Sequence, residues 1–282
     1  MGWTERQAAM LKEMGLRVEV DAHASSASAA PVVEPVAREE RALRQDLTPS
    51  ALPSTLPSVL PASSPPSAPT TAAGLAIATM DWSELRDTVA ACTACKLCQG
   101  RTQTVFGVGH LQADWMVVGE APGEQEDAQG KPFVGKSGQL LDNMLRALGV
   151  SRDATGADRS RQAYIANSVK CRPPGNRNPA PDELAQCEPF LVRQIALLQP
   201  KIILAMGKFA VQSLLRSAEP IGKLRGRVHH YQGVPLIVTY HPAYLLRNLD
   251  EKARAWEDLC LAAETAERAE RADEPADARA AG

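Results

Sequence analysis

The chain has 282 residues, of which 44% are hydrophobic and 23% charged, and its formal net charge is -2. This length and composition suit one globular domain with an additional segment, or two small domains. No apolar run is long enough to cross a bilayer, and the start does not resemble a signal peptide. We therefore expect a cytoplasmic protein without a membrane span.

Charge is distributed unevenly along the chain. Residues 81–262 carry 22 Lys/Arg against 19 Asp/Glu, a net charge of +3, so the two ends supply the negative balance. A mildly basic core of this kind is compatible with a nucleic-acid partner but does not demonstrate one.

The first 80 residues differ from the rest. Residues 1–20 predict a short amphipathic helix in which Thr4 and Gln7 have capping-box spacing and Gly15 ends the helix. This helix is either a docking peptide for a protein partner or a packing appendage. Residues 21–80 are rich in Ala, Ser and Pro, and such a segment buries too little apolar surface to offset its ordering entropy. We expect it to be a disordered tether.

The folded unit is predicted over residues 81–262, where apolar runs alternate with helical patterns. The predicted strands are 115–118, 164–169, 201–206 and 236–240. The predicted helices are about 138–149, 182–199, 207–216 and 249–271. This alternation indicates an α/β fold, with a parallel sheet and helices on both faces. Residues 263–282 form a charged tail that we expect to fray from about Glu264.

Polar residues follow three of the predicted strands. The stretch WMVVGEAPGEQED, from Trp115 to Asp127, passes from an apolar run into an acidic loop that contains Glu120. Asn167 and His241 occupy the ends of two other strands. Ligands of open α/β sheets bind at the carboxyl ends of the strands, so these residues predict a site. The alternative is that the acidic loop is simply solvated.

Six cysteines in an intracellular chain indicate a metal or cluster rather than disulfides. Cys92 and Cys95 form a CxxC pair, and Cys171 and Cys187 stand 16 positions apart. Four thiolates from these two regions would suit zinc or an iron–sulfur cluster. Cys98 extends the first pair to CxxCxxC and competes as a ligand, Cys260 is predicted to be core, and scattered buried cysteines are the alternative.

The segment GKPFVGKS, Gly130 to Ser137, matches the phosphate-loop pattern G-x-x-x-x-G-K-[ST]. That loop must leave a buried strand directly and lead into a helix. The preceding residues, EQEDAQ, do not form a strand pattern, so we reject the interpretation as a nucleoside triphosphatase.

The motifs GEAPGEQED, PFVGKSGQLL, NSVKCRPPGNRNP and HPAYLLRN, with CTACKL upstream, closely resemble those of family-4 bacterial uracil-DNA glycosylases. The resemblance runs from about Trp82 to Trp256. It implies a three-layer α/β/α fold with a central four-stranded parallel sheet. It also implies a structural [4Fe-4S] cluster held by Cys92, Cys95, Cys171 and Cys187. Ala121 replaces a frequent glycine of the family.

The resemblance assigns uracil-containing DNA as the substrate and gives the motif residues their roles. An Asn167 amide can donate to a carbonyl and accept from N3–H, which suits uracil and not cytosine. Phe133 offers a ring for base stacking, with core packing as its alternative. By resemblance, Glu126 excludes the methyl group of thymine.

The remaining motif residues are expected to act in bond cleavage and in DNA binding. His241 is placed to stabilise charge on the departing base, with loop capping as its alternative, and Glu120 is placed to stabilise a sugar cation or orient water. Apolar wedges and a phosphate-binding cation would come from Tyr244, Leu245, Leu246 and Arg247.

A monomeric DNA-repair hydrolase is therefore expected. Two other classes of function stay open from the sequence. One is a module that binds uracil or damaged DNA without cutting it, and the other is an iron–sulfur electron carrier.

Overall fold

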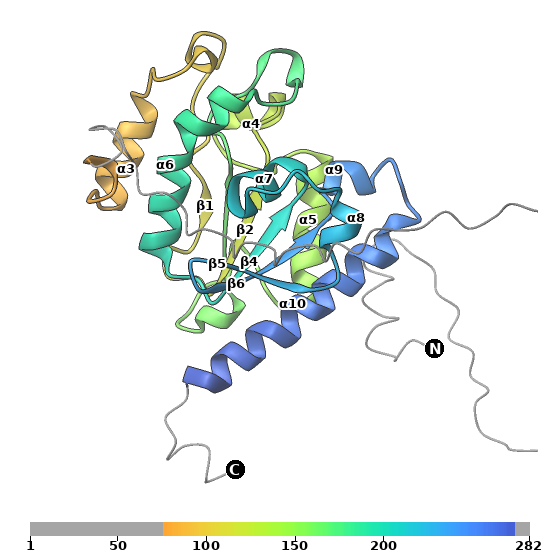
Figure 1. The fold of residues 1–282 in the computed structure, drawn as a ribbon. Coiled ribbons are helices and arrows are strands. Elements are labelled where there is room, and N and C mark those ends of the chain that lie inside the picture. The colour runs from red at the N-terminus through yellow and green to blue at the C-terminus, as the bar shows by residue number, and fades with distance from the viewer. Residues whose placement is uncertain (1–75, 274–282) are drawn as a thin grey trace, which may run out of the picture.

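The computed structural model describes residues 76–273 (Figure 1). Its centre is a six-stranded sheet with the order β1-β3-β2-β4-β6-β5. The strands are β1 (Val108–Gly109), β2 (Trp115–Gly119), β3 (Ala163–Asn167), β4 (Ile202–Met206), β5 (Val228–Tyr231) and β6 (Val234–Thr239).

The four central strands are mutually parallel, which confirms the four strands predicted from the sequence. The edge strands β1 and β5 pair antiparallel to β3 and β6 and were not predicted. β1 has two residues, and β5 has the sequence VHHY with only one buried residue. Neither strand therefore carries a recognisable apolar pattern.

Helices cover both faces of the sheet, and α3 lies to one side of the sheet (Figure 1). The longer ones are α3 (Trp82–Ala90), α5 (Lys136–Ala147), α6 (Pro181–Leu198), α7 (Lys208–Leu215) and α10 (Glu251–Asp273). The shorter ones are η1 (Lys96–Gln99), α4 (Glu124–Gln129), η2 (Arg159–Arg161), η3 (Pro174–Asn176), α8 (Ile221–Leu224) and α9 (Pro242–Leu245).

Two apolar clusters fill the space between the sheet and its helices. Val117 and Leu204 face one cluster, which also contains side chains of α5, α9 and α10. Met116 and Ile203 face the other, together with side chains of α6, α7 and α8. Neighbouring strand residues thus bury their side chains on opposite faces, which gives the continuous apolar runs of a parallel sheet. The predicted three-layer α/β/α architecture is confirmed.

A third cluster lies beside the sheet, where α3 and η1 pack near α6. It includes Ile77, which is buried, and Arg193 Nε donates to the Met80 carbonyl oxygen at 2.6 Å. The folded unit therefore begins before Asp81, the predicted boundary. The predicted helix of residues 1–20 and most of the predicted tether lie outside the described residues.

The end of the folded unit also differs from the prediction. α10 continues to Asp273, and Thr265 and Ala266 on it are buried. The expected fraying from Glu264 was wrong because this part of the helix still has a face against the core. Among the described residues, no helix is long and apolar enough to span a membrane.

Candidate active site

A cavity of about 800 Å³ opens at the carboxyl ends of the parallel strands. The structure brings together here the three residues that the sequence placed after strands: Glu120 after β2, Asn167 at the end of β3 and His241 after β6. Gly207, after β4, completes the row. The parallel register of the strands thus converts separate motifs into one site.

Asn167 lies deep in this cavity, with only 2% of its surface exposed. Its side-chain Oδ1 is buried and has no hydrogen-bond partner among the described residues. A buried amide oxygen without a partner is costly, so an acceptor at this position favours a ligand that donates a hydrogen bond.

Gly119 makes room for the Asn167 amide and the Phe133 ring. A Cβ on Gly119 would lie 2.5 Å from Asn167 Oδ1 and 2.6 Å from Phe133 Cζ, so no larger residue fits without displacement. Phe133 itself has a left-handed backbone with φ of 54°. Its carbonyl oxygen would lie 1.9 Å from a Cβ at Gly138. This close approach holds the Phe133 turn against α5.

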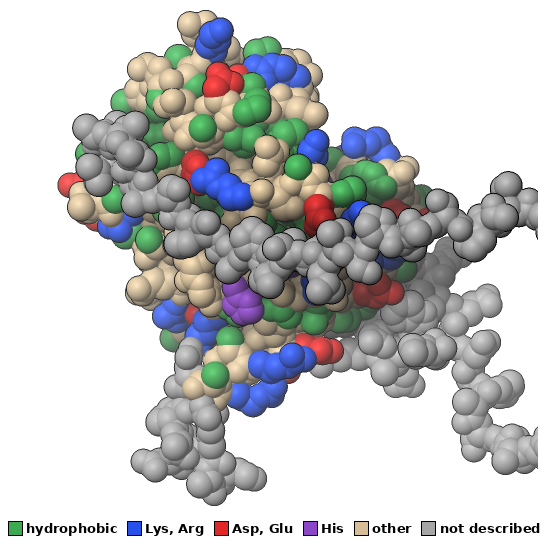
Figure 2. All heavy atoms as spheres, in the orientation of Figure 1, with side chains coloured by type: hydrophobic (Ala, Val, Ile, Leu, Met, Phe, Trp, Pro, Cys, Tyr) green, Lys and Arg blue, Asp and Glu red, His purple; other side chains and the backbone are tan. Residues whose placement is uncertain are grey.

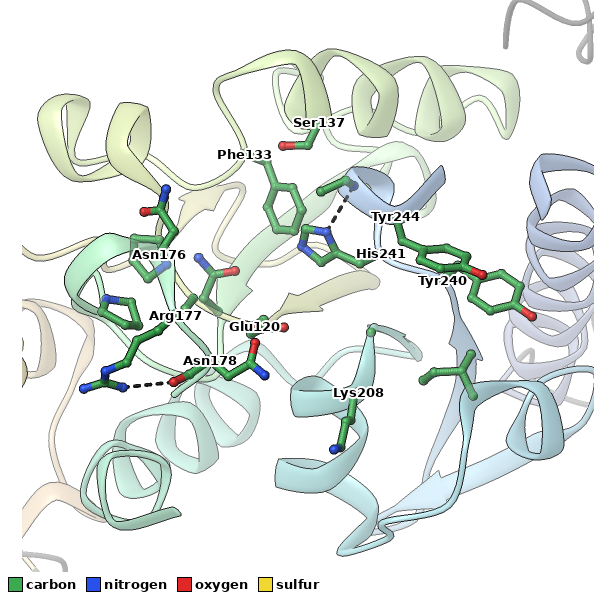
Figure 3. A pocket seen from close by; sticks show the side chains of 18 of the residues that line it. Glu120, Phe133, Ser137, Asn176, Arg177, Asn178, Lys208, Tyr240, His241 and Tyr244 are labelled. Atoms are coloured by element: carbon green, nitrogen blue, oxygen red, sulfur yellow. Dashed lines mark hydrogen bonds between the residues drawn. The ribbon is translucent and has the colours of Figure 1, made fainter. Parts of the chain in front are cut away.

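The rings of Phe133 and His241 stack with centroids 5.2 Å apart (Figure 3). One side of the predicted stacking residue therefore faces His241 within the protein. Both rings line the cavity, where they form its aromatic wall beside Asn167.

His241 is the N-cap of α9, and its Nδ1 accepts a hydrogen bond from the Ala243 backbone N–H at 3.2 Å. In the neutral ring, Nε2 must then carry the proton and act as a donor. Burial, together with the nearby charge of Arg247, lowers the pKa of His241 to about 4. His241 is thus both the loop cap of the alternative interpretation and a neutral donor on the cavity wall.

Glu120 is half-buried, and desolvation raises the pKa of its carboxyl group, while Lys208 acts in the opposite direction. Lys208 begins α7 and also lines the cavity. Sequence reasoning missed it, although a lysine directly after the glycine that ends a buried strand was a usable signal.

The acidic loop is more ordered than the sequence suggested. Its second half forms α4, which was predicted as loop. The Glu126 carboxylate accepts hydrogen bonds from the backbone N–H groups of Gly123 and Val134, both at 3.1 Å. Asp127 is buried and accepts from the Thr102 backbone N–H. Glu126 and Ala121 both line the cavity.

The HPAYLLRN segment forms the rim of the cavity. Tyr244 and Arg247 line the cavity, and Leu246 is 40% exposed. Leu245 is fully buried in the core under α9, so it cannot act as an exposed wedge, contrary to the sequence-based assignment. The helical turn of α9 points this leucine inward because every third or fourth residue shares a face.

Several lining residues were not found from the sequence. Tyr240 stacks on Tyr244 with centroids 5.1 Å apart, and Figure 3 shows this pair on the opposite side of His241 from Arg177 and Asn178. The loop after Cys171 contributes Asn176, Arg177 and Asn178. Its polar composition was visible, but its distance from the sheet motifs in sequence concealed its position.

Positive charge is not concentrated on the face shown in Figure 2. Lys and Arg side chains there alternate with acidic and apolar ones. Lys208, Arg177 and Arg247 line the cavity, and the Arg177 guanidinium is already paired with the Glu183 carboxylate.

Five cysteines line a second, narrower cavity between η1 and α6: Cys92, Cys95, Cys98, Cys171 and Cys187. Cys260 lies apart on α10, next to the core. Within the described part of the chain, no three His, Cys, Asp or Glu side chains converge closely enough to hold a single metal ion. Several thiols around one space are the ligand set of a four-thiolate zinc site or of an iron–sulfur cluster.

The surroundings of the thiols fit an anionic group. The Cys171 sulfur accepts from Arg101 Nη1 at 3.0 Å, and the Cys187 sulfur accepts from the Lys170 backbone N–H at 3.2 Å. Hydrogen bonds of this kind stabilise thiolate ligands and tune clusters. Burial raises the pKa of the Cys187 thiol to about 12, although the charge and the backbone hydrogen bond of Lys170 act in the opposite direction.

Comparison with known proteins agrees with this geometry. The family model described as "Uracil DNA glycosylase superfamily" matches residues 106–260. The chain belongs to the uracil-DNA glycosylase superfamily. The matched segment includes β2, β3, β4 and β6 and all three strand-end residues of the cavity.

The alignments with relatives in this superfamily cover most of the length of each relative. A "Type-4 uracil-DNA glycosylase" of Thermotoga maritima is 43% identical over 165 residues, which are 58% of this chain and 82% of the relative. Another protein of that name, from Sulfurisphaera tokodaii, is 44% identical over 174 residues, 58% of this chain and 76% of the relative. A "Type-5 uracil-DNA glycosylase" of Pyrobaculum aerophilum is 33% identical over 146 residues, 49% and 64% of the two chains.

The structure also shows where the segment that resembles a phosphate loop lies. Gly130 is the C-cap of α4 and Ser137 lies in the first turn of α5, so the segment joins two helices. The segment does not follow a strand directly, which agrees with rejecting the nucleoside triphosphatase interpretation.

Proposed function

We propose that this protein is a DNA-repair glycosylase that flips uracil out of DNA and hydrolyses its N-glycosidic bond, which leaves an abasic site. The observation that carries this proposal is the buried, unpartnered Asn167 Oδ1 in a cavity that also holds Glu120 and His241. The type-4 relatives support the same reaction.

Recognition of the base rests on the Asn167 amide. Its Oδ1 accepts from N3–H of uracil, and its Nδ2 donates to the O4 carbonyl. Cytosine presents the reverse pattern, an acceptor at N3 and a donor at N4, and would leave both groups of the amide unpaired. Phe133 supplies the stacking surface, while Glu126 and Ala121 bound the pocket near the edge where thymine carries a methyl group.

In the chemical step, the bond between C1′ and N1 breaks and its electron pair stays on uracil. The oxygen of a water molecule bonds to C1′, and its released proton balances the proton that uracil takes up. His241, neutral and with Nε2–H as its donor, hydrogen-bonds O2 as negative charge grows there. The Glu120 carboxylate stabilises the sugar cation or orients the water.

The rim holds the DNA. Tyr244 and Leu246 fill the gap left by the flipped nucleotide, and Arg247 contacts a phosphate. Because Leu245 is buried, its contribution is to support α9 rather than to enter the duplex.

A [4Fe-4S] cluster would be held by Cys92, Cys95, Cys171 and Cys187, with Cys98 as the competing fifth thiol. The cluster would supply a covalent cross-link between η1, the loop after β3 and α6, and no redox step is needed for hydrolysis. Arg101 and the Lys170 backbone donate hydrogen bonds to two of these sulfurs.

The proposed organisation extends to the rest of the chain. Residues 81–262, with short extensions at both ends, form the catalytic domain of a monomeric, cytoplasmic enzyme. The chain before Ile77 tethers a docking helix in residues 1–20 to that domain, and the residues after Asp273 provide a charged tail.

The test is excision from a uracil-containing oligonucleotide, read as alkali-labile sites. Cleavage at uracil and not at cytosine or thymine is expected. Tight binding without cleavage would identify a non-catalytic uracil-binding module instead. Absence of both, with reversible reduction of an iron centre, would identify an electron carrier.

A further inference from the structure

A fully buried lysine connects the candidate active site with the cysteines. Lys170 is 1% exposed and lies between Asn167 and Cys171 in sequence. Its Nζ donates to the Asn167 backbone carbonyl oxygen at 2.8 Å and to Gln194 Oε1 at 2.6 Å. Its own backbone N–H donates to the Cys187 sulfur at 3.2 Å.

The contacts of Lys170 leave its charge unbalanced. Both acceptors of the ammonium group are neutral, and no carboxylate forms an ion pair with it in the described part of the chain. Burial of an ammonium group is costly unless an anion compensates for it. The Lys170 backbone N–H donates to the Cys187 sulfur and Cys171 is the next residue in the chain, so the thiolates of an assembled centre would lie close to Lys170.

The residues that Lys170 contacts are themselves held in place by hydrogen bonds. Gln194 is also fully buried, and its Nε2 donates to the Phe106 carbonyl oxygen at 2.9 Å and to the Tyr164 hydroxyl at 3.2 Å. Between Asn167 and Lys170, the backbone N–H groups of Ser168 and Val169 donate to the carbonyl oxygens of Gly119 and Glu120. The short segment 167–170 therefore fixes the backbone of both Asn167 and Glu120.

We infer that Lys170 is a positioning residue that couples the cysteine centre to uracil recognition. Its ammonium group holds the Asn167 backbone and at the same time balances the negative charge of the thiolates. This inference rests on the proposed function and deepens it. One side chain then serves both cysteine ligation and base recognition, although neither Cys171 nor Cys187 lines the active-site cavity.

Two substitutions separate the two roles of Lys170. Lys170→Met removes both the charge and the donor, whereas Lys170→Gln removes the charge and keeps an amide donor for the Asn167 carbonyl. Lys131→Met, at an exposed position outside both cavities, is the matched control. The full-length proteins are purified without air. The measurements are iron per protein, the rate of iron loss to a chelator, inhibition by free uracil, and single-turnover excision at saturating DNA.

For Lys170→Met, we expect the inhibition constant of free uracil to rise about tenfold, because a buried carbonyl loses its donor and the amide loses its fixed position. Iron should be lost several times faster than from wild type. Lys170→Gln should lose iron equally fast but bind uracil close to wild type. A lysine with a merely structural role would lower the melting temperature without this separation between the two variants.

A folded Lys170→Met protein with unchanged uracil inhibition would overturn the inference. If Lys170→Met is insoluble, Lys170→Gln decides: faster iron loss supports the coupling, and wild-type iron retention overturns it. Failure of the proposed function gives a different result, since the wild-type protein itself would then excise no uracil.

Discussion

The active-site cavity and the cysteine cavity are built in different ways. In the first, His241, Glu126 and Phe133 are held by backbone hydrogen bonds and close packing within the protein itself. In the second, five thiols surround a narrow space, and hydrogen bonds from Arg101 and from the Lys170 backbone reach the sulfurs of Cys171 and Cys187. The first region is preorganised for a ligand that comes and goes, whereas in the second the proposed cluster would act as a permanent ligand that holds the segments together.

This difference separates chemistry from stability. Substitutions in the active-site cavity should change recognition or rate while the protein stays folded. Substitutions of the cysteines should remove the folded protein itself, because assembly of a metal site is coupled to folding.

The sharpest test of this difference is Cys171→Ala, which should abolish folding, with loss of iron and of soluble protein. Iron and sulfide in equal amounts are expected in brown wild-type protein. The matched control is Cys260→Ala, which removes a thiol on α10 outside the cysteine cavity and should keep full iron content. Stoichiometric zinc without iron, in protein purified without air, would contradict the cluster assignment.

On the active-site side, His241→Ala should slow single-turnover excision about a hundred- to a thousandfold, since one donor to a developing negative charge is worth roughly 3–4 kcal/mol. Binding of uracil-containing DNA should stay near wild type, because the partner of His241 becomes fully charged only as the bond breaks. Weakened binding with an intact rate at saturation would make His241 a docking residue.

Low pH should reduce the free energy of unfolding through His241 in the active-site cavity, because burial lowers the pKa of this residue from 6.5 to about 4. The unfolded chain binds a proton at this residue between these pH values and the folded protein does not, so stability is complete above pH 6.5 and falls as pH decreases towards 4. The loss amounts to about 3 kcal/mol. Denaturant unfolding across this range should show a weaker pH dependence in His241→Gln than in wild type. Parallel curves would contradict a buried neutral histidine.

Asn167 should determine which base is recognised, whereas His241 should determine the rate of bond cleavage. Asn167→Asp replaces the amide donor with an acceptor, so a uracil carbonyl would face a carboxylate. We expect kcat/KM for uracil to fall about ten- to a hundredfold, the cost of an unpaired buried polar group. Excision of cytosine, whose N4 is a donor, should not fall and can rise slightly. Equal losses for both bases would indicate damage to the pocket rather than altered recognition.

The smallest effect is expected from removal of residues 1–75, since both cavities lie wholly within residues 76–273. Excision from a short oligonucleotide should stay within about twofold of the full chain, as expected if residues 1–75 contribute nothing to either cavity. Removal of residues 1–80 is the comparison variant. It also removes Ile77, whose burial stabilises the domain by about 1.5–3 kcal/mol, and should lower the melting temperature.

The sequence by itself determined the parallel sheet and the strand-end residues. Four short, mostly apolar runs that alternate with helical patterns indicated parallel strands buried on both faces, and the carboxyl ends of such strands share one edge. Glu120, Asn167 and His241 could therefore be brought together without coordinates. The motifs carried the assignment to the superfamily because their order and spacing leave few alternatives.

Other features depended on the tertiary structure, because they join segments far apart in the chain. The burial of Leu245 follows from the direction in which one helical turn meets the core. The edge strands β1 and β5 exist only because a neighbouring strand offers hydrogen bonds to segments with little pattern of their own. The contact of Lys170 with Asn167 and Gln194 requires β3 and α6 to pack together, and no local pattern in the sequence distinguishes a lysine that is buried there from one that is solvated.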